Sequence, residues 1–288
     1  MTERTLDADV LCRWIGRKES VDDVIRPGHA ALLSATLDRD QDWAKPGADL
    51  PPLWHWTYFL GAAPRRDLGR DGHPKLGGFL PPVALPRRMW AGGRLKFCRP
   101  LRLGEEARRT STIRNVEIKH GRSGALCFVT IEHAICVGGE LRIEEEQDVV
   151  YREDPSPGSA SRATAAPPDA QVSETLQPDS TLLFRYSALT FNGHRIHYDR
   201  DYAKEVEGYG GLVVHGPLIA TLLLDLAVRQ SPGASVAGFS YRGVAPIFDT
   251  QAFSLNLKPE GEGLHVWAAA GGQLSMDATV TLGQSVAV

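Results

Sequence analysis

The sequence predicts an α+β protein of two similar halves, each an antiparallel sheet wrapped around a helix. Strands that alternate apolar and polar residues recur in both halves with glycine-rich turns between them, which indicates antiparallel meanders. A segment rich in proline, serine and alanine, residues 153–180, interrupts this pattern and predicts a linker. A strongly apolar helical segment, residues 217–229, follows the linker and is expected to be buried.

The first half, residues 1–152, carries the longer strand patterns. Alternation runs over residues 110–118, 126–135 and 141–151, and glycines occupy the turns between these stretches. Residues 28–37 are a candidate helix, but Pro81, Pro82 and Pro86 interrupt the region where a long central helix is expected. We therefore expect this half to keep the sheet and to have lost its chemistry.

The second half, residues 181–288, repeats the arrangement. Candidate strands cover residues 252–257, 264–270 and 276–282, and the central helix covers 217–229. Ala91-Gly92 precedes Pro100-Leu101 at the same spacing at which Ala237-Gly238 precedes Pro246-Ile247, which favours duplication. A meander around one buried helix is a hot-dog fold. The sequence thus predicts a double hot-dog: a degenerate N-terminal domain over 1–152, a linker over 153–180 and a catalytic C-terminal domain over 181–288.

Composition narrows the class of partner. The net charge is −3, so the chain has no overall basic character for binding nucleic acid. No apolar run approaches the roughly 20 residues that span a bilayer, and the N-terminus lacks the pattern of a signal peptide. We expect a cytoplasmic protein that uses neither nucleic acid nor membrane as a partner and that forms a homodimer.

Polar residues gather in residues 185–215, directly before the central helix. The segment contains Asn192, His194, His197 and His215, and Gly216 follows at once. A helix N-terminus offers unpaired N–H groups and a partial positive charge, which can stabilise an oxyanion. Imidazole titrates near neutral pH, so a histidine beside such a site suits proton transfer. We assign this role to His197; for His194 and His215, satisfaction of backbone groups is the competing interpretation.

Other site types fit less well. His194 and His197 could hold a metal together with Asp199 or His215, but only their spacing supports this, and we predict no metal. The glycines at 208–211 lack the third glycine and the βαβ context of a dinucleotide loop. The sequence contains no GxSxG nucleophile elbow.

Residues 189–199, LTFNGHRIHYD, resemble the signature of the MaoC family of (R)-specific enoyl-CoA hydratases. In that signature a catalytic Asp precedes a catalytic His by five residues, and a His-Gly pair later opens the central helix. The resemblance implies that His197 is the catalytic histidine and that the N–H of Gly216 binds the enolate oxygen. Asn192 stands where the family has Asp, so the usual second acid–base group is missing here.

The resemblance extends to the hydroxyacyl-thioester dehydratase type 2 branch, which includes bacterial mesaconyl-C4-CoA (3-methylfumaryl-CoA) and itaconyl-CoA hydratases. The segments YSALTFNGHRIHYD, GLVVHGPL, GGFLPPVALPRRMWAGG and GRSGALCFVTIEHAI carry it. It implies a hydro-lyase that converts mesaconyl-C4-CoA or itaconyl-CoA to citramalyl-CoA, with an acyl-CoA thioester as substrate and no cofactor apart from the coenzyme A of that substrate. The alternatives are a fatty-acid-type 3-hydroxyacyl-thioester dehydratase, a thioesterase using Asp225, and a non-catalytic thioester-binding subunit, which the loss of Asp at 192 favours.

The predicted site residues fall into two groups. The predicted catalytic residues are His197, Asn192 and Gly216. The predicted substrate-binding residues are Arg195, His215, Arg242, Arg88 and Tyr198. From the first half we expect only the pocket wall and the CoA entrance, so His55 and His73 are predicted to be dispensable for kcat.

Overall fold

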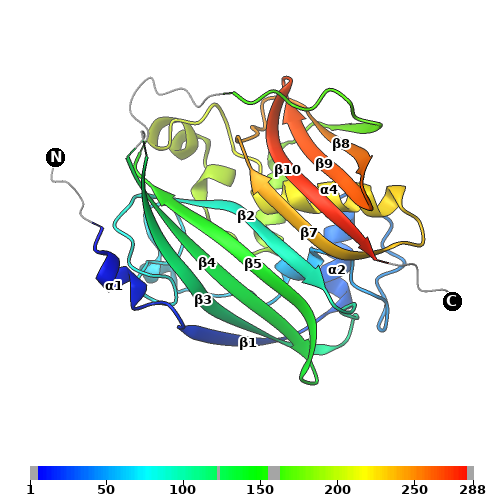
Figure 1. Cartoon of the computed structure of the whole chain (residues 1–288), viewed down its shortest axis with the longest axis horizontal. Helices are drawn as coiled ribbons and strands as arrows, with labels where there is room; N and C mark the ends of the chain where they lie inside the picture. The colour runs from blue at the N-terminus through cyan, green and yellow to red at the C-terminus, as the bar shows by residue number, and fades with distance from the viewer. Residues whose placement is uncertain (1–5, 122–123, 155–162, 284–288) are drawn as a thin grey trace.

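The computed structural model describes residues 6–121, 124–154 and 163–283. Within them, ten strands form one antiparallel sheet in the order β1-β3-β4-β5-β2-β7-β10-β9-β8-β6 (Figure 1). The strands of the first half are β1 (Lys18–Val24), β2 (Arg87–Phe97), β3 (Glu106–Gly121), β4 (Gly124–Val137) and β5 (Glu140–Arg152). Those of the second are β6 (Val172–Leu176), β7 (Ser235–Gly243), β8 (Phe253–Glu260), β9 (Gly263–Ala270) and β10 (Gln273–Gly283).

The strand order is the same when it is followed outward from the centre in either direction. From β2 it runs 2-5-4-3-1, and from β7 it runs 7-10-9-8-6, so each strand of one half has a counterpart in the other. The two halves meet where β2 pairs with β7, in a register that sets Gly92 opposite Arg242 and Lys96 opposite Gly238. This topology confirms the double hot-dog and the duplication predicted from the sequence.

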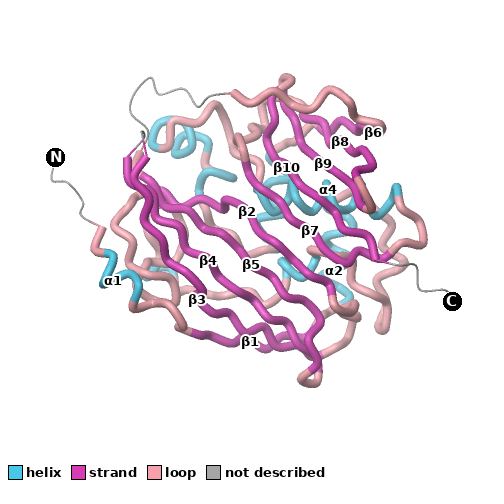
Figure 2. The backbone as a smooth tube through the Cα atoms, viewed as in Figure 1, coloured by secondary structure: helices cyan, strands magenta, loops and turns pink. Residues whose placement is uncertain are grey.

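The helices α2 (Pro27–Thr36) and α4 (Gly216–Gln230) lie behind the sheet in the view of Figure 2. The central helix of the second half is α4 (Gly216–Gln230), whose buried leucines pack on β7, β8, β9 and β10. Two shorter helices, α2 (Pro27–Thr36) and α3 (Ser180–Leu189), each follow the first strand of their half and pack on each other. A five-residue helix, α1 (Ala8–Cys12), lies against β3.

The two halves differ most at the position of α4. Between α2 and β2 the first half has only the 3-10 turns η1 (Trp54–Thr57) and η2 (Arg65–Asp67), and the rest of the segment is irregular. Pro81, Pro82 and Pro86 all lie in this irregular stretch, as expected for residues that lack an N–H donor. The first half therefore keeps its sheet and has replaced its central helix by a long loop.

The predicted linker is shorter in the structure than in the sequence analysis. Residues 155–162 lie outside the described residues, but Val172–Leu176 form β6, an edge strand paired with β8. Within β6, Val172, Glu174 and Leu176 are half-buried and alternate with the exposed Ser173 and Thr175. The composition of the whole stretch does not reveal this period of two. Among the described residues, no helix has both the length and the apolar character required to cross a membrane.

Candidate active site

The loop that carries the predicted site begins where α3 ends. Asp179 caps the start of α3 by accepting a hydrogen bond from the N–H of Leu182 at 2.7 Å. Phe191 then adopts a left-handed backbone, with φ of 49°, which reverses the chain after the helix. Asn192 fixes the turn that follows, because its Oδ1 accepts from the N–H of His194 at 2.9 Å. The side-chain oxygen of Asn192, a predicted catalytic residue, therefore already accepts a hydrogen bond from the backbone.

His197 lies in the 3-10 turn η3 (Arg195–His197) and is buried. Its Nδ1 lies 2.7 Å from the carbonyl oxygen of Val213. Since a carbonyl only accepts, Nδ1 carries the proton and Nε2 keeps a free lone pair. Burial lowers the pKa of His197 to about 4, although the bond to Val213 works in the opposite direction. At neutral pH this imidazole is thus neutral and able to accept a proton at Nε2.

His215 supports His197 from one side. The two rings stack with their centroids 3.7 Å apart and an interplanar angle of 18°. The Nε2 of His215 is 2.8 Å from the hydroxyl of Ser187, and its side chain is fully buried. Burial also holds the pKa of His215 well below its ordinary value, so the stacked pair carries no charge repulsion at neutral pH. His215 is thus held by Ser187 and packs face to face on the ring of His197.

Gly216 begins α4 directly after His215, so its N–H belongs to the first turn, where helices have no internal acceptor. A Cβ atom at this position would lie 2.7 Å from Cε3 of Trp90, which shows that the indole rests on the glycine. Trp90 in turn stacks on Tyr241 at 4.5 Å between ring centroids, and Trp56 meets both rings edge-on. Aromatic side chains from both halves therefore pack around the start of the helix.

Two of the predicted substrate-binding residues serve the loop itself. Arg195 pairs with Asp199 at 2.7 Å and lies over the ring of Tyr202 at 4.1 Å. The hydroxyl of Tyr198 donates to the carbonyl of Gly193 at 3.0 Å, with half of its side chain exposed. Both interactions brace the turn that carries the histidines.

The two remaining arginines differ in their surroundings. Arg242 on β7 is 72% exposed and 3.9 Å from Asp277, a weak pair at the surface. Arg88 on β2 is half-buried and has no carboxylate within ion-pair distance in the described part of the chain. It lines a hollow of about 240 Å³ together with Asp71, His73 and Lys75. Of the predicted arginines, Arg88 is the one without an ion pair among the described residues, and its charge acts on the nearby Asp71.

The structure adds two residues from the first half that the sequence analysis did not assign to the site. His73 lies against His194, with ring centroids 4.2 Å apart, and its Nδ1 is 2.8 Å from Oδ2 of Asp71. His194 in turn meets His197 edge-on at 5.3 Å. A carboxylate–histidine pair from the first half therefore lies beside the histidines of the second.

The metal site considered from the sequence is not assembled. Asp199 is engaged by Arg195, and Nδ1 of His197 by the carbonyl of Val213. Among the described residues, the group with metal-ligand atoms close together is Asp71, His73 and His194, whose atoms lie within 4.8 Å of one another. Since Nδ1 of His73 already faces Asp71, this group has the geometry of a hydrogen-bonded carboxylate–histidine pair beside a second histidine.

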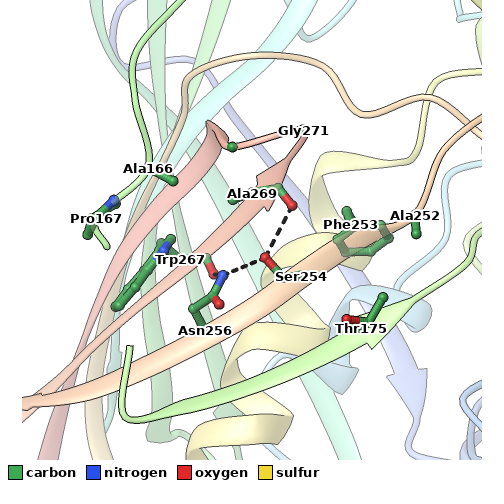
Figure 3. A pocket seen from close by; sticks show the side chains of 11 residues that line it. Ala166, Pro167, Thr175, Ala252, Phe253, Ser254, Asn256, Trp267, Ala269 and Gly271 are labelled. Carbon is green, nitrogen blue, oxygen red and sulfur yellow. Dashed lines mark hydrogen bonds between the residues drawn. The ribbon is translucent and has the colours of Figure 1, made fainter. Parts of the chain in front are cut away.

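A larger hollow, of about 320 Å³, lies elsewhere on the molecule (Figure 3). Ser254 and Asn256 of β8 and Trp267 of β9 line it, and Asn256 donates to the hydroxyl of Ser254 at 2.9 Å. These residues alternate along their strands with Leu255 and Val266, which pack in the same core as α4. The hollow is thus on the face of the sheet away from α4 and the histidines.

A double hot-dog with a base histidine beside the N-terminus of its central helix defines a protein of the acyl-thioester hydratase and dehydratase class. The family model of hydroxyacyl-thioester dehydratase type 2 matches residues 53–249, and the chain belongs to this family. A mesaconyl-C(4)-CoA hydratase of Chloroflexus aurantiacus is 50% identical, over 94% of this chain and 97% of its own.

Solved structures support the same fold. HtdX of Mycobacterium tuberculosis matches with a TM-score of 0.69 at 16% identity, over 92% of this chain and 99% of its own. Another protein of that organism, described as having a double hot-dog fold, matches with a TM-score of 0.57 at 14% identity, over 93% and 96% of the two chains.

Proposed function

We propose that this protein adds water across the double bond of a short dicarboxylyl-CoA, with mesaconyl-C4-CoA as the preferred substrate and citramalyl-CoA as the product. The geometry that supports this best is His197, whose Nδ1 is committed to the Val213 carbonyl and whose Nε2 is a free base beside the first turn of α4. The half-identical relative from Chloroflexus aurantiacus, named for mesaconyl-C(4)-CoA, supports the choice of substrate.

In the proposed reaction, Nε2 of His197 removes a proton from water while the water oxygen bonds to the β-carbon. The π electrons of the double bond move toward the thioester oxygen, where the N–H of Gly216 stabilises the enolate. The imidazolium of His197 then returns its proton to the α-carbon. One O–H bond is broken and one C–O and one C–H bond are formed, so the step needs no other reactant.

This scheme distinguishes the two C5 isomers. In mesaconyl-C4-CoA the double bond is conjugated with the thioester carbonyl, so the charge that develops reaches the oxygen facing Gly216. In itaconyl-CoA the double bond is one carbon further away and is conjugated with the distal carboxylate instead. A helix N-terminus directed at the thioester oxygen stabilises only the first transition state. We therefore expect a lower kcat/KM for itaconyl-CoA than for mesaconyl-C4-CoA.

The distal carboxylate of such a substrate needs a cation in a buried site. Arg88 supports this role because it lines the hollow next to His73 and has no acidic partner within ion-pair distance in the described residues. Replacement of Arg88 by Leu should raise KM for mesaconyl-C4-CoA at least about 10-fold and leave crotonyl-CoA, which has no distal carboxylate, nearly unchanged.

The alternatives find less support. A thioesterase that used Asp225 would need a free carboxylate, whereas Asp225 pairs with Arg39 at 2.6 Å and with Arg229 at 3.1 Å. A dehydratase of fatty-acid type needs space for a long acyl chain, whereas Trp56, Trp90 and Tyr241 pack tightly around the start of α4. A purely binding subunit would not require His197 to keep a free Nε2.

The test is a panel of mesaconyl-C4-CoA, itaconyl-CoA and crotonyl-CoA offered to the purified full-length chain. We expect loss of the enoyl absorbance and formation of citramalyl-CoA, with kcat/KM highest for mesaconyl-C4-CoA. A higher kcat/KM for crotonyl-CoA than for both dicarboxylates would refute the substrate assignment. Release of free CoA without hydration would refute the hydratase.

We also propose that the protein is a cytoplasmic homodimer, in which α2 and α3 form the contact. Leu32 on α2 and Phe184 on α3 are 59% and 65% exposed although their helices pack together, which leaves an apolar surface for a second copy. Sedimentation analysis should give a dimer for the wild-type chain and a monomer for Phe184→Ser. A wild-type monomer at micromolar concentration would refute this arrangement.

A further inference from the structure

The two halves carry similar triplets at the point where they touch. Asp71-Gly72-His73 comes from the first half and Asn192-Gly193-His194 from the second. The turns are built alike: the first side chain accepts from the N–H of the histidine, at 3.1 Å for Asp71 and 2.9 Å for Asn192. The glycines contact each other so closely that a Cβ on Gly72 would lie 1.9 Å from the carbonyl oxygen of Gly193. The triplets therefore hold His73 and His194 side by side.

The two triplets differ in their first residue. Burial would raise the pKa of Asp71, but hydrogen bonds and charge from His73, with the charge of Arg88, outweigh it and hold that pKa below its usual value. The ionised carboxylate accepts the Nδ1 proton of His73, so Nε2 of His73 is an acceptor. An acidic residue of the kind missing at position 192 is thus present at position 71.

His73 can transmit the effect of the Asp71 carboxylate to His194 through hydrogen bonds. The ligand atoms of Asp71, His73 and His194 lie within 4.8 Å of one another. Three groups that each hydrogen-bond one water at about 2.8 Å lie about 4.6 Å apart, so a single water spans this group. In such a water bridge a ring nitrogen of His73 would accept a hydrogen bond from the water and an N–H of His194 would donate to it, which leaves the other nitrogen of His194 with a free lone pair.

We propose that His194 is a catalytic residue that accepts the second hydrogen of the attacking water, with Asp71 and His73 as its positioning residues. This inference rests on the hydratase function proposed above. His197 takes the first proton and returns it to the α-carbon; the hydrogen held by His194 stays on the oxygen and becomes the hydroxyl of the product.

The charges around His194 agree with this role. Besides Asp71 and His73 from the first-half loop, His197 from η3 and Arg88 from β2 face it. Burial lowers the pKa of His194 far below its ordinary value; His73, His197 and Arg88 lower it further, and only Asp71 raises it. His194 is therefore neutral at the pH of catalysis and can accept a hydrogen bond from water.

The kinetic test compares Asp71→Asn and His73→Asn with Asp67→Asn in the full-length chain. Asp67 lies in the same loop, and its carboxylate is 54% exposed beside Arg66. Asparagine at 73 keeps a donor toward Asp71 but has no counterpart of Nε2. We expect both site variants to lose about 10- to 100-fold in kcat with KM changed less than about 3-fold, while Asp67→Asn matches the wild type.

A second substitution makes the test specific. Asn192→Asp places a carboxylate at the equivalent position of the second triplet, so the double variant Asp71→Asn/Asn192→Asp should recover at least about 10-fold over Asp71→Asn. A merely structural role of Asp71 would not be rescued in this way. Wild-type kcat in both site variants, or no rescue by Asn192→Asp, would overturn the inference. Loss of one bound zinc per chain together with activity in Asp71→Asn would also overturn it, in favour of a metal site.

A readout without turnover separates this inference from the proposed function. In ¹⁵N-histidine-labelled protein, with His194→Gln used to assign the signal, we expect one neutral tautomer of His194 in the wild type and a mixture in Asp71→Asn. Equal tautomer populations in the two proteins would refute the relay, whatever the substrate is. A single tautomer in a protein that hydrates none of the enoyl-CoA panel would refute only the proposed function.

Discussion

Replacing Gly72 by alanine would place a Cβ atom 1.9 Å from the carbonyl oxygen of Gly193, where real Cβ contacts are almost never shorter than 3.0 Å. Because both contacting atoms would belong to rigid backbone, the two triplets must move apart by about 1 Å, and no side-chain rotation can relieve the contact. Gly72 also has φ of +87°, which costs a residue with a Cβ about 1–2 kcal/mol.

Gly47 offers a matched control. Its φ is +86°, but nothing lies within 4 Å of a Cβ built there, so Gly47→Ala carries the backbone strain without the collision. Gly47→Ala should lose about 1–2 kcal/mol of unfolding free energy in urea titrations, and Gly72→Ala should lose more because the collision adds to the strain. Only Gly72→Ala should also lose activity, by about 100-fold in kcat, because an angstrom-scale displacement of a positioned group has effects of that size.

Steady-state kinetics on the preferred enoyl-CoA measures the difference. If Gly72→Ala keeps the kcat of Gly47→Ala, contact between the two triplets is not needed for catalysis, and the reasoning from their geometry fails. If Gly47→Ala loses as much activity as Gly72→Ala, general destabilisation explains both variants.

Five further outcomes follow from the site. His197→Ala should lose about 10²–10⁴-fold in kcat, and His197→Gln should not recover it, because glutamine cannot take a proton; a His197→Gln enzyme of near wild-type rate would contradict the assignment. Since the pKa of His197 is about 4, kcat/KM should be constant from neutral pH to about 5 and should fall at lower pH. A fall centred near pH 6.5 would show that burial does not lower the pKa of His197. The pKa of His197 in the folded protein lies below the ordinary 6.5. Its contribution to the free energy of unfolding is therefore complete above pH 6.5 and is lost as pH falls toward 4. Urea unfolding of the wild type and of His197→Gln at a series of acidic pH values should show this loss. Gly216→Ala should lower kcat because the new Cβ would lie 2.7 Å from Trp90 and displace its ring. Gly61→Ala, where nothing lies within 4 Å of the new Cβ, should keep the wild-type kcat. Equal kcat in the two variants would contradict the argument from packing. Asn192→Ala should lower kcat because the turn that holds the N–H of His194 is lost, whereas Asn192→Asp keeps the acceptor and should stay active; a fully active Asn192→Ala would remove residue 192 from the mechanism.

Much of the second half could be predicted because its signals are local. The apolar run at 217–229 predicts α4 to within one residue at each end, and the His-Gly pair before it predicts the site. The alternating strands and the repeated spacing of Ala-Gly and Pro predict the duplication that the sheet order confirms. These features depend on periodicity and on neighbours in sequence, which a single chain displays directly.

The position of Asp71 and His73 beside His194 could not be predicted because it depends on a tertiary contact between the two halves. Asp71 and His73 lie in an irregular loop without periodicity, more than a hundred residues before His194. One signal was present: a polar residue, Gly and His occur in that order at 71–73 and at 192–194. Comparing the two halves for short matching residue triplets, as well as for strand patterns, would have found this signal. The stacking of His215 on His197 could not be predicted for a similar reason, since only the tertiary structure brings the two rings together.

The continuous pairing of β2 with β7 has a consequence for how such an enzyme can evolve. Two identical hot-dog subunits paired at these strands would form a symmetric dimer. Every substitution would then occur in both subunits, so the dimer would have either two sites or none. Joining the copies in a single chain removes that constraint. One copy is then free to exchange its central helix for a loop, and the loop is free to reach across the junction and complete the one site that remains.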